Sequence, residues 1–348
     1  MKTINMLAIA GAIIVFAFPS PAHCYEAAQD ATTKRMMAMI VDLGGHDAVR
    51  KNSGKLVRCA DGGTRKVSIV KRGTTTTYRG DYRTCREGDS VRDGIYEIVF
   101  NGDEIAGSTE KRSINGELFD AAKEGNAAKV RKLIKAKADV NYTESITLAD
   151  GGSVERLSPL MAATMAGSLD AVKALVAGGG WVNYLNSKTV NSLWIAAHNG
   201  NLEIVKHLAT HGAYLNNSNN EDVTPLMAAA MNGHFEVVKF LVDKKARIDE
   251  VHKEGDSALM FAVARGHTDI ARFLIDAGAN VNIRNAFGVT ALIISAAEGN
   301  DEVARKLLEK NADTTVRTAT GLTALDVARA REMHSVADLL EEQGKEQN

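Results

Sequence analysis

The chain has 348 residues, and its 42 Lys and Arg side chains nearly balance 43 Asp and Glu, for a formal net charge of −1. A chain of near-zero net charge without a base-stacking motif is not expected to bind nucleic acid. Its three cysteines, Cys24, Cys59 and Cys85, lack the paired spacing of a zinc site, so no structural metal is expected.

Residues 1–22 have the features of a secretory signal peptide. Lys2 supplies a positive start, and residues 6–18 carry no charge but are too few to span a bilayer comfortably. Ser20 and Ala22 are the small residues that a signal peptidase reads, so cleavage is expected after Ala22, with cleavage after Cys24 as the alternative. This predicts a periplasmic or secreted bacterial protein. If the segment stays uncleaved, it anchors the protein in the membrane instead.

Residues 25–113 are predicted to form a separate small module. Residues 32–43 have helical spacing, and the methionines of this helix are more typical of a core than of a cofactor site. Alternating runs follow at residues 55–59, 66–71, 76–79 and 94–100. Turn residues separate these runs, which predicts an α+β module with an antiparallel sheet. The module resembles no family that we identify.

The cysteines of this module are expected to form a disulfide. Export would place Cys59 and Cys85 in an oxidising compartment, where such a bridge persists. Closing a loop of this length would stabilise a small domain by about 3 kcal/mol. In a cytosolic chain the same residues would be two free thiols.

The stretch of residues 50–86 is strongly basic, with 11 Lys and Arg against Asp61 and Asp81. Such a stretch could meet an anionic membrane surface or an acidic partner. It could equally be the solvated side of a sheet, where Lys and Arg discourage edge pairing.

A regular repeat begins after this module. Leucines recur every 33 residues, at Leu160, Leu193, Leu226, Leu259, Leu292 and Leu325, and a glycine follows seven residues after each of the first five. Leu118 and Gly125 show the same offset, which gives seven units. Within a unit, Thr224 is a good N-cap and Pro225 suits the first helical position. Gly233 is placed to end this first helix, and a second apolar stripe follows it.

The repeated motifs resemble the ankyrin repeat. They read TPLMAAA at residues 224–230, NGHFEVVK at 232–239, GHTDIA at 266–271 and AGANVN at 277–282. The resemblance covers about residues 115–343. It implies a mainly α solenoid of about seven helix–turn–helix units over residues 114–343, with a disordered tail at 344–348.

Three departures from the family pattern stand out. Nine extra residues lie between the first two units, around residues 145–152; they belong either to the binding side or to a tolerated surface loop. Glu332 and Glu341 make the last unit polar, as expected of a C-terminal cap. The family's histidine after the leucine hydrogen-bonds turn backbone, and packing is expected to substitute for it at Met161, Trp194, Met227, Met260, Ile293 and Asp326.

In ankyrin proteins, partners usually lie across the turn tips and the exposed side of the first helices. By position, the resemblance implies binding residues at the tips, namely Lys188, Val190, Glu221, Val223, Glu254, Asp256, Phe287 and Val289. On the first helices it implies Met165, His198, Asn199, Met231, Asn232, Arg265 and Glu298. Met165, Met231 and Phe287 suggest an apolar binding stripe, although scattered exposed apolar residues are normal.

An aromatic group marks the second and third units. Trp181 stands where the family usually has a polar residue, with Tyr184 and Tyr214 nearby and Tyr142 one unit before. Tyr and Trp anchor interfaces because they bury much area and keep a polar tip. The group either binds an external partner or packs against the insertion or the N-terminal module.

The sequence contains no catalytic motif, and no cofactor or metal is expected. His234 and His267 occupy the family's Gly-His position, which is structural, and residues 178–180 are a helix C-cap rather than a phosphate loop. The leading hypothesis is a non-enzymatic protein-binding protein of the bacterial cell envelope, either an inhibitor of the immunity type or a support for an enzyme. Alternatively, the chain is a secreted effector, or residues 25–113 carry a ligand-binding or catalytic activity involving His46, Tyr82, Arg83 and Cys85.

Overall fold

The computed structural model describes residues 56–58, 64–72, 75–87, 90–101, 104–147 and 153–346. The described residues up to Glu117, together with Glu144–Leu157, form one unit, and Leu118–Thr143 with the residues from Ser158 onward form the other. The signal segment, the helix expected at residues 32–43, and Cys59 lie outside the described residues. The disulfide and the export signal therefore stay predictions.

The first of these two structural units contains an antiparallel sheet with strand order β1-β2-β3-β4-β5. The strands are β1 Leu56–Arg58, β2 Thr64–Arg72, β3 Thr75–Glu87, β4 Ser90–Asn101 and β5 Glu104–Arg112. The four alternating runs of the sequence fall on β1–β4. The alternation did not predict β5, because Gly107 and the charged residues at its end interrupt the pattern.

The nine extra residues between the first two repeats contribute to a β-hairpin rather than to a loop without secondary structure. Strands β6, Glu144–Thr147, and β7, Ser153–Leu157, pair antiparallel, with Ile146 opposite Val154. Val154 and Leu157 are buried. Burial of these two side chains helps to hold β7 in place.

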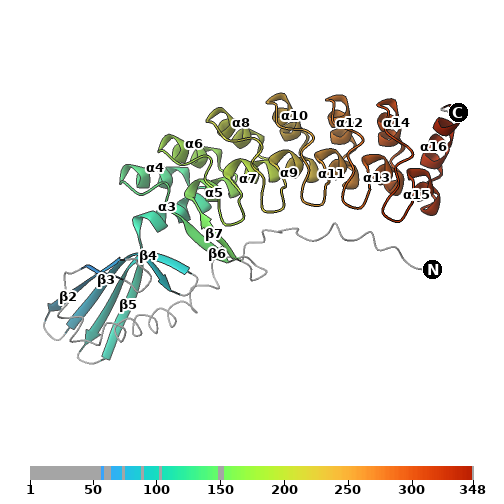
Figure 1. The fold of residues 1–348 in the computed structure, drawn as a ribbon. Coiled ribbons are helices and arrows are strands. Elements are labelled where there is room, and N and C mark those ends of the chain that lie inside the picture. Colours follow the sequence, from blue (N-terminus) through green and yellow to red (C-terminus); the bar gives the residue numbers. More distant parts are fainter. Residues whose placement is uncertain are drawn as a thin grey trace. The chain divides into compact units, whose positions relative to one another are not determined.

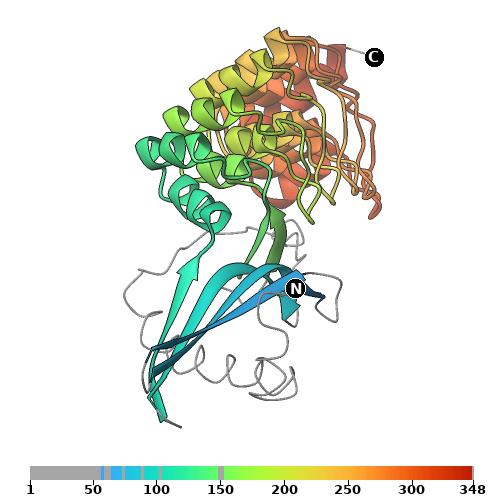
Figure 2. The ribbon, with the colours of Figure 1, turned by 90° about the vertical axis from the view of Figure 1, so that its left-hand side faces the viewer.

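Fourteen helices of the described chain form seven pairs, which confirms the predicted number of units (Figure 1). The first helices of the seven pairs are here called the inner helices. They are α3 Ile114–Lys123, α5 Pro159–Met165, α7 Ser192–His198, α9 Pro225–Met231, α11 Ala258–Ala264, α13 Ala291–Glu298 and α15 Ala324–Ala330. The second helices of the pairs are called the outer helices. They are α4 Ala127–Lys135, α6 Leu169–Ala177, α8 Leu202–Thr210, α10 Phe235–Asp243, α12 Thr268–Asp276, α14 Asp301–Glu309 and α16 His334–Glu346. Figure 2, a view turned by a quarter, shows the two rows of helices as stacked layers.

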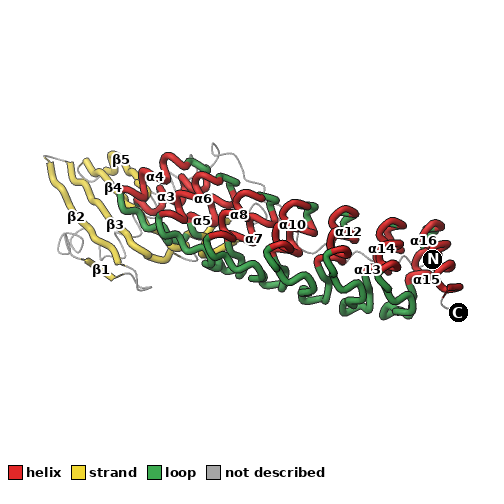
Figure 3. The backbone as a smooth tube through the Cα atoms, turned by 90° about the horizontal axis from the view of Figure 1, so that it is seen from above, coloured by secondary structure: helices red, strands yellow, loops and turns green. Residues whose placement is uncertain are grey.

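Five long loops connect an outer helix to the next inner helix, and we call them fingers. They are the first finger at residues 178–191, the second at 211–224, the third at 244–257, the fourth at 277–290 and the fifth at 310–323. Figure 3 shows that the fingers lie together along one edge of the helical stack.

The periodic leucines build the core of the stack. Leu118, Leu160, Leu193, Leu226, Leu259 and Leu292 are fully buried, and Leu325 of the terminal unit is half-buried. Burial of such a side chain stabilises the fold by about 1.5–3 kcal/mol relative to leaving it exposed. Alanines beside these leucines, such as Ala196, Ala229 and Ala262, are also buried and let neighbouring inner helices approach closely.

Each inner helix from α5 onward begins at a side-chain cap. The oxygens of Ser158, Asn191, Thr224, Ser257, Thr290 and Thr323 each accept the backbone N–H three residues further on. Pro159 and Pro225 follow two of these caps at the start of the helix. Such a cap contributes about 1 kcal/mol, so the caps fix where each finger ends.

Packing substitutes for the missing family histidine at four positions, as expected, but not at the other two. Met161, Met227, Met260 and Ile293 are buried. Trp194 instead donates its Nε1–H to the carbonyl oxygen of Val223 at 2.8 Å. Asp326 accepts the backbone N–H of Thr323 at 2.9 Å and completes a capping box, so hydrogen bonds replace the histidine there.

The terminal unit keeps the backbone of the repeat without its glycine. Glu332 adopts a φ of 59°, the left-handed value that glycine has in the other units. Glu341 on α16 pairs with Arg329 of α15 at 2.7 Å. None of the described helices combines the length and the apolar composition that crossing a membrane requires.

Candidate protein-binding surface

The fingers share one turn, built around a polar side chain that recurs every 33 residues. Asn186 Oδ1 accepts the N–H groups of Lys188 at 2.9 Å and Val190 at 3.0 Å. Asn219 and Asn285 do the same for the residues two and four positions further on, and Thr318 Oγ1 accepts from Leu322 at 3.1 Å. Asparagine favours such turns because its side chain can bond its own downstream backbone.

Neighbouring fingers are joined by a backbone ladder at their tips. Asn220 N–H donates to the oxygen of Lys188 at 3.2 Å, and Lys253 N–H donates to that of Glu221 at 3.1 Å. Ala286 donates to Glu254 at 2.7 Å, and Ala319 donates to Phe287 at 2.8 Å. The backbone of all four tips is therefore held in place, while the side chains of Lys188, Glu221, Glu254 and Phe287 are exposed.

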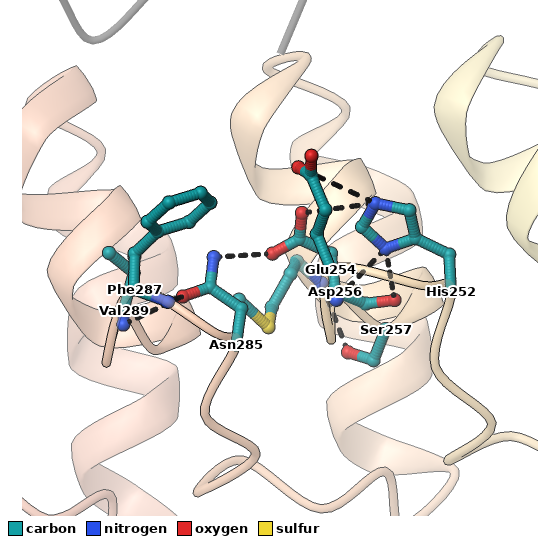
Figure 4. A network of polar contacts seen from close by, with 8 residues as sticks. His252, Glu254, Asp256, Ser257, Asn285, Phe287 and Val289 are labelled. Atoms are coloured by element: carbon teal, nitrogen blue, oxygen red, sulfur yellow. Dashed lines mark hydrogen bonds and ion pairs between the residues drawn. The ribbon is translucent and has the colours of Figure 1, made fainter. Parts of the chain in front are cut away.

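The third finger differs because His252 replaces the asparagine (Figure 4). Its Nδ1 accepts the N–H of Asp256 at 3.0 Å, and its Nε2 lies 3.8 Å from Asp256 Oδ2. Asp256 is only 4% exposed and accepts from Asn285 Nδ2 at 2.8 Å. Burial raises the pKa of the Asp256 carboxyl, and the hydrogen bond from Asn285 opposes this shift. Ser257, next in the chain, accepts the N–H of Met260 with its hydroxyl oxygen as a helix cap.

Four of the eight assigned tip residues, Val190, Val223, Asp256 and Val289, are buried and do not face solvent as expected. Val190 and Val223 are 8% exposed, and Asp256 is 4% exposed; Val289 is buried in the same way. The residue before each, for example Thr189 with a φ of 56° or Asp222 with 59°, has a left-handed backbone. This reverses the chain, so the tip side chain faces solvent and the one two positions later returns to the core.

The ends of the inner helices offer a second row of side chains. Asn199, Asn232, Arg265 and Glu298 are exposed, whereas Met165, Met231 and His198 are half-buried. His198 stacks on Trp194 with a centroid separation of 5.1 Å, and burial, with a smaller effect of His234, lowers the pKa of its imidazole. Of the suggested apolar stripe, Phe287 alone is largely open to solvent, at 49%.

Two of the four aromatic residues are strongly exposed. Trp181 is 59% and Tyr214 is 63% exposed, and their backbone N–H groups donate to Asn141 and Asn183, each at 2.8 Å. Tyr184 lies beside Trp181, with ring centroids 6.0 Å apart. Tyr142 is buried and is removed from the group. Trp181 and Tyr214 are therefore open to solvent within the repeat unit of the chain.

The two histidines of the Gly-His motif have the structural role that the sequence indicates. His234 Nε2 donates to the carbonyl oxygen of His198 at 2.9 Å, and His267 Nε2 donates to that of Met231 at 3.2 Å. Among the residues that the structure describes, no three His, Cys, Asp or Glu side chains are grouped to hold a metal ion. Tyr82, Arg83 and Cys85 lie in β3, and His46 lies outside the described residues.

Sequence reasoning missed the network around His252, although its signal was present. Asn186, Asn219, His252, Asn285 and Thr318 follow the same 33-residue period as the leucines. A polar residue that recurs at this period in the loops is the mark of a turn-forming side chain. The histidine is the irregular member of that series.

Comparisons with known proteins agree with this geometry. An ankyrin-repeat profile of three copies matches residues 118–219 and 193–285, and a profile of many copies matches residues 274–328. The crystal structure of the human ASB11 ankyrin repeat domain is 26% identical, with a TM-score of 0.55 over 64% of this chain and 96% of that chain. No curated protein matches the chain.

The matches bear on function in general terms. They extend to 627 chains of solved structures, so the fold is widely shared and does not by itself identify a partner. Ankyrin repeats are in general protein-binding scaffolds and are typically non-catalytic. The profiles cover residues 118–328, well over half of the sequence, and the chain therefore belongs to the ankyrin-repeat family.

Proposed function

We propose that the chain is a non-enzymatic binding protein whose partner, another protein, lies across the finger tips and the exposed ends of the inner helices. The observation that supports this most is the backbone ladder from Lys188 to Phe287. Because the ladder and the side-chain turns fix the tips before binding, little ordering entropy is lost when a partner arrives.

Phe287 is the principal anchor of this surface. It is an aromatic side chain 49% exposed on a finger whose backbone is bonded on both sides. Aromatic residues that become buried at the centre of an interface carry much of its affinity. The charged side chains of Glu221 and Glu254 occupy the tips of the second and third fingers, where they would steer association and select the partner's charge.

Trp181 and Tyr214 supply a second pair of anchors. They occupy the same position in consecutive units, where the other units carry Arg247, Asn280 and Asp313. A partner that covers the first three fingers would bury these rings as well. The aromatic pair thus extends the proposed surface to the first and second fingers.

The protein is proposed to act outside the cytoplasm of a bacterial cell, because residues 1–22 read as an export signal. In that place the scaffold is either an inhibitor of a toxic enzyme or a support for a resident one. Addition of the purified chain to the captured enzyme separates the two, because an inhibitor lowers the enzyme's activity and a support preserves it.

Capture from an envelope extract with the full chain, followed by mass spectrometry, identifies the partner. Binding is then measured for Phe287→Ala and for Glu254→Lys. We expect Phe287→Ala to cost about 2 kcal/mol, a factor of about 30 in Kd. Glu236, exposed on outer helix α10, provides the matched control Glu236→Lys. Equal affinities of all three variants and the wild type would refute the assignment of the surface.

A further inference from the structure

His252 is the one titratable side chain among the turn-forming residues of the five fingers. Four fingers hold their turn with an amide or hydroxyl oxygen, from Asn186, Asn219, Asn285 or Thr318. In the third finger the ring nitrogen Nδ1 of His252 takes this place and accepts the N–H of Asp256 at 3.0 Å. An amide or hydroxyl oxygen keeps its acceptor role at any physiological pH, whereas an imidazole nitrogen loses it on protonation.

The acceptor role of Nδ1 specifies the tautomer of the neutral ring. Nδ1 must keep its lone pair, so the proton of the neutral ring is on Nε2. Nε2 lies 3.8 Å from Asp256 Oδ2 and 4.0 Å from Glu254 Oε2, and these carboxylates are the charged groups that face it (Figure 4). The Phe261 ring of α11 packs beside the imidazole at 5.0 Å, and Lys253 is directed to Glu221 of the second finger at 3.6 Å.

A second proton on the ring would change the hydrogen bonds of the turn. Nδ1–H and the N–H of Asp256 would then be two donors facing each other at 3.0 Å, and Nδ1–H would find an acceptor in the carbonyl oxygen of Asp256, 3.3 Å away. Glu254 and Asp256 attract the charged ring, so the ring stays near them while the N–H of Asp256 loses its acceptor. Asp256 is buried, and an N–H without a partner there is costly.

The change would not stay within the third finger. Asp256 accepts from Asn285 Nδ2 at 2.8 Å, and Asn285 is the turn-forming residue of the fourth finger. Ala286 of the fourth finger also donates to the oxygen of Glu254 at 2.7 Å. Two hydrogen bonds therefore connect the His252 turn to the finger that presents Phe287.

We propose that His252 is a proton-sensitive element of the finger surface: its protonation releases the N–H of Asp256 and loosens the third finger from the fourth. Because Glu254 and Phe287 belong to the surface proposed above, acidification would weaken partner binding there. That consequence rests on the proposed function, whereas the response of the turn does not.

Amide hydrogen exchange of the full chain by NMR tests the turn without a partner. Protection factors of Asp256 and Ala286 are compared at about pH 8 and about pH 5, a range in which imidazole charges. In the wild type both should fall by about fivefold or more at the lower pH, while Val190 and Val223, held by Asn186 and Asn219, should stay within twofold as internal controls. His252→Asn installs the side chain of the other fingers and should abolish the fall.

A wild type without a change, or an equal fall in His252→Asn, would overturn the proposal. If His252→Asn does not fold, the comparison of Asp256 with Val223 within the wild type still decides the question. Partner affinity at the two pH values is the second measurement. A pH-dependent turn with pH-independent binding would refute its link to the surface and leave the proposed function in place.

Discussion

Gly233 and His267 are in contact across the boundary between two repeats, where the imidazole of His267 packs directly against the backbone of Gly233. A Cβ on residue 233 would lie 2.6 Å from His267 Cε1, closer than atoms can approach. The same ring donates Nε2–H to the oxygen of Met231 at 3.2 Å. The glycine therefore serves two needs, its left-handed φ of 76° and the close approach of the next unit.

Replacing Gly233 with Ala should destabilise the stack more than replacing Gly266 with Ala. Both residues have a left-handed backbone, with φ of 76° and 72°, which costs an alanine about 1–2 kcal/mol. Only the Cβ at 233 meets the histidine of the next unit, since nothing lies within 4 Å of one at 266. Urea unfolding measures both variants, and equal losses would mean that the ring moves aside freely.

Replacing Asn191 with Thr should stabilise the protein. Asn191 caps α7 with its oxygen, but in the part of the chain that the structure describes its fully buried Nδ2 has no acceptor. Thr224 and Thr290 cap the equivalent helices without such an amide. We expect a gain of about 1 kcal/mol in the free energy of unfolding. The reverse change, Thr290→Asn, should lose stability, and a gain there would contradict the explanation.

Replacing His198 with Met should remove part of the protein's sensitivity to acid. Burial, and then His234, lowers the pKa of His198 from its ordinary value of 6.5, so the folded state disfavours the charged ring. Above pH 6.5 the ring is neutral in both the folded and the unfolded chain, so it does not affect the free energy of unfolding. As the pH falls below 6.5 toward the lowered pKa of the folded state, the unfolded chain binds the proton more readily, and the free energy of unfolding decreases. Methionine stands at the equivalent positions 165 and 231.

The measurement for His198→Met is the difference in thermal midpoint between about pH 7.5 and pH 5. The variant should lose less than the wild type over this interval. His334, exposed at the start of α16, provides the control His334→Gln, which should behave like the wild type. An unchanged pH dependence in His198→Met would show that burial of this ring is not the cause.

The periodic part of the fold was predictable because residues with the same structural role recur in successive repeats. Leu160, Leu193 and Leu226 fill the same place in successive units, so one pattern determined both the helices and the core. The finger tips were only half predictable. Lys188 and Val190 are two residues apart and would share a face in an extended chain, but the left-handed Thr189 between them turns one outward and the other inward.

Features that occur only once in the chain could not be predicted from its sequence for a related reason. The β6–β7 hairpin and the partners of His252 each occur once, so no second copy could reveal their structure. The link from Asp256 to Asn285 joins residues 29 positions apart in different fingers, and it depends on how the fingers stack.

Leu259→Ala and Glu254→Ala should separate folding from binding within one unit. Leu259 is buried in the core, and its truncation should cost about 2–5 kcal/mol of unfolding free energy. The Glu254 side chain is exposed, and its part in the finger ladder is made by the backbone oxygen, which alanine keeps. Glu254→Ala should therefore leave the urea midpoint unchanged, and if it unfolded the protein the finger would have a different structure.

The direct test of the binding surface is photo-crosslinking of the full chain in its own cells. A benzophenone amino acid replaces Phe287 at the tip of the fourth finger in one variant and Phe240 on outer helix α10 in another. Binding through the fingers predicts a discrete crosslinked protein of added mass from position 287 and none from position 240. A crosslink from position 240 alone, or from neither position, would contradict the account.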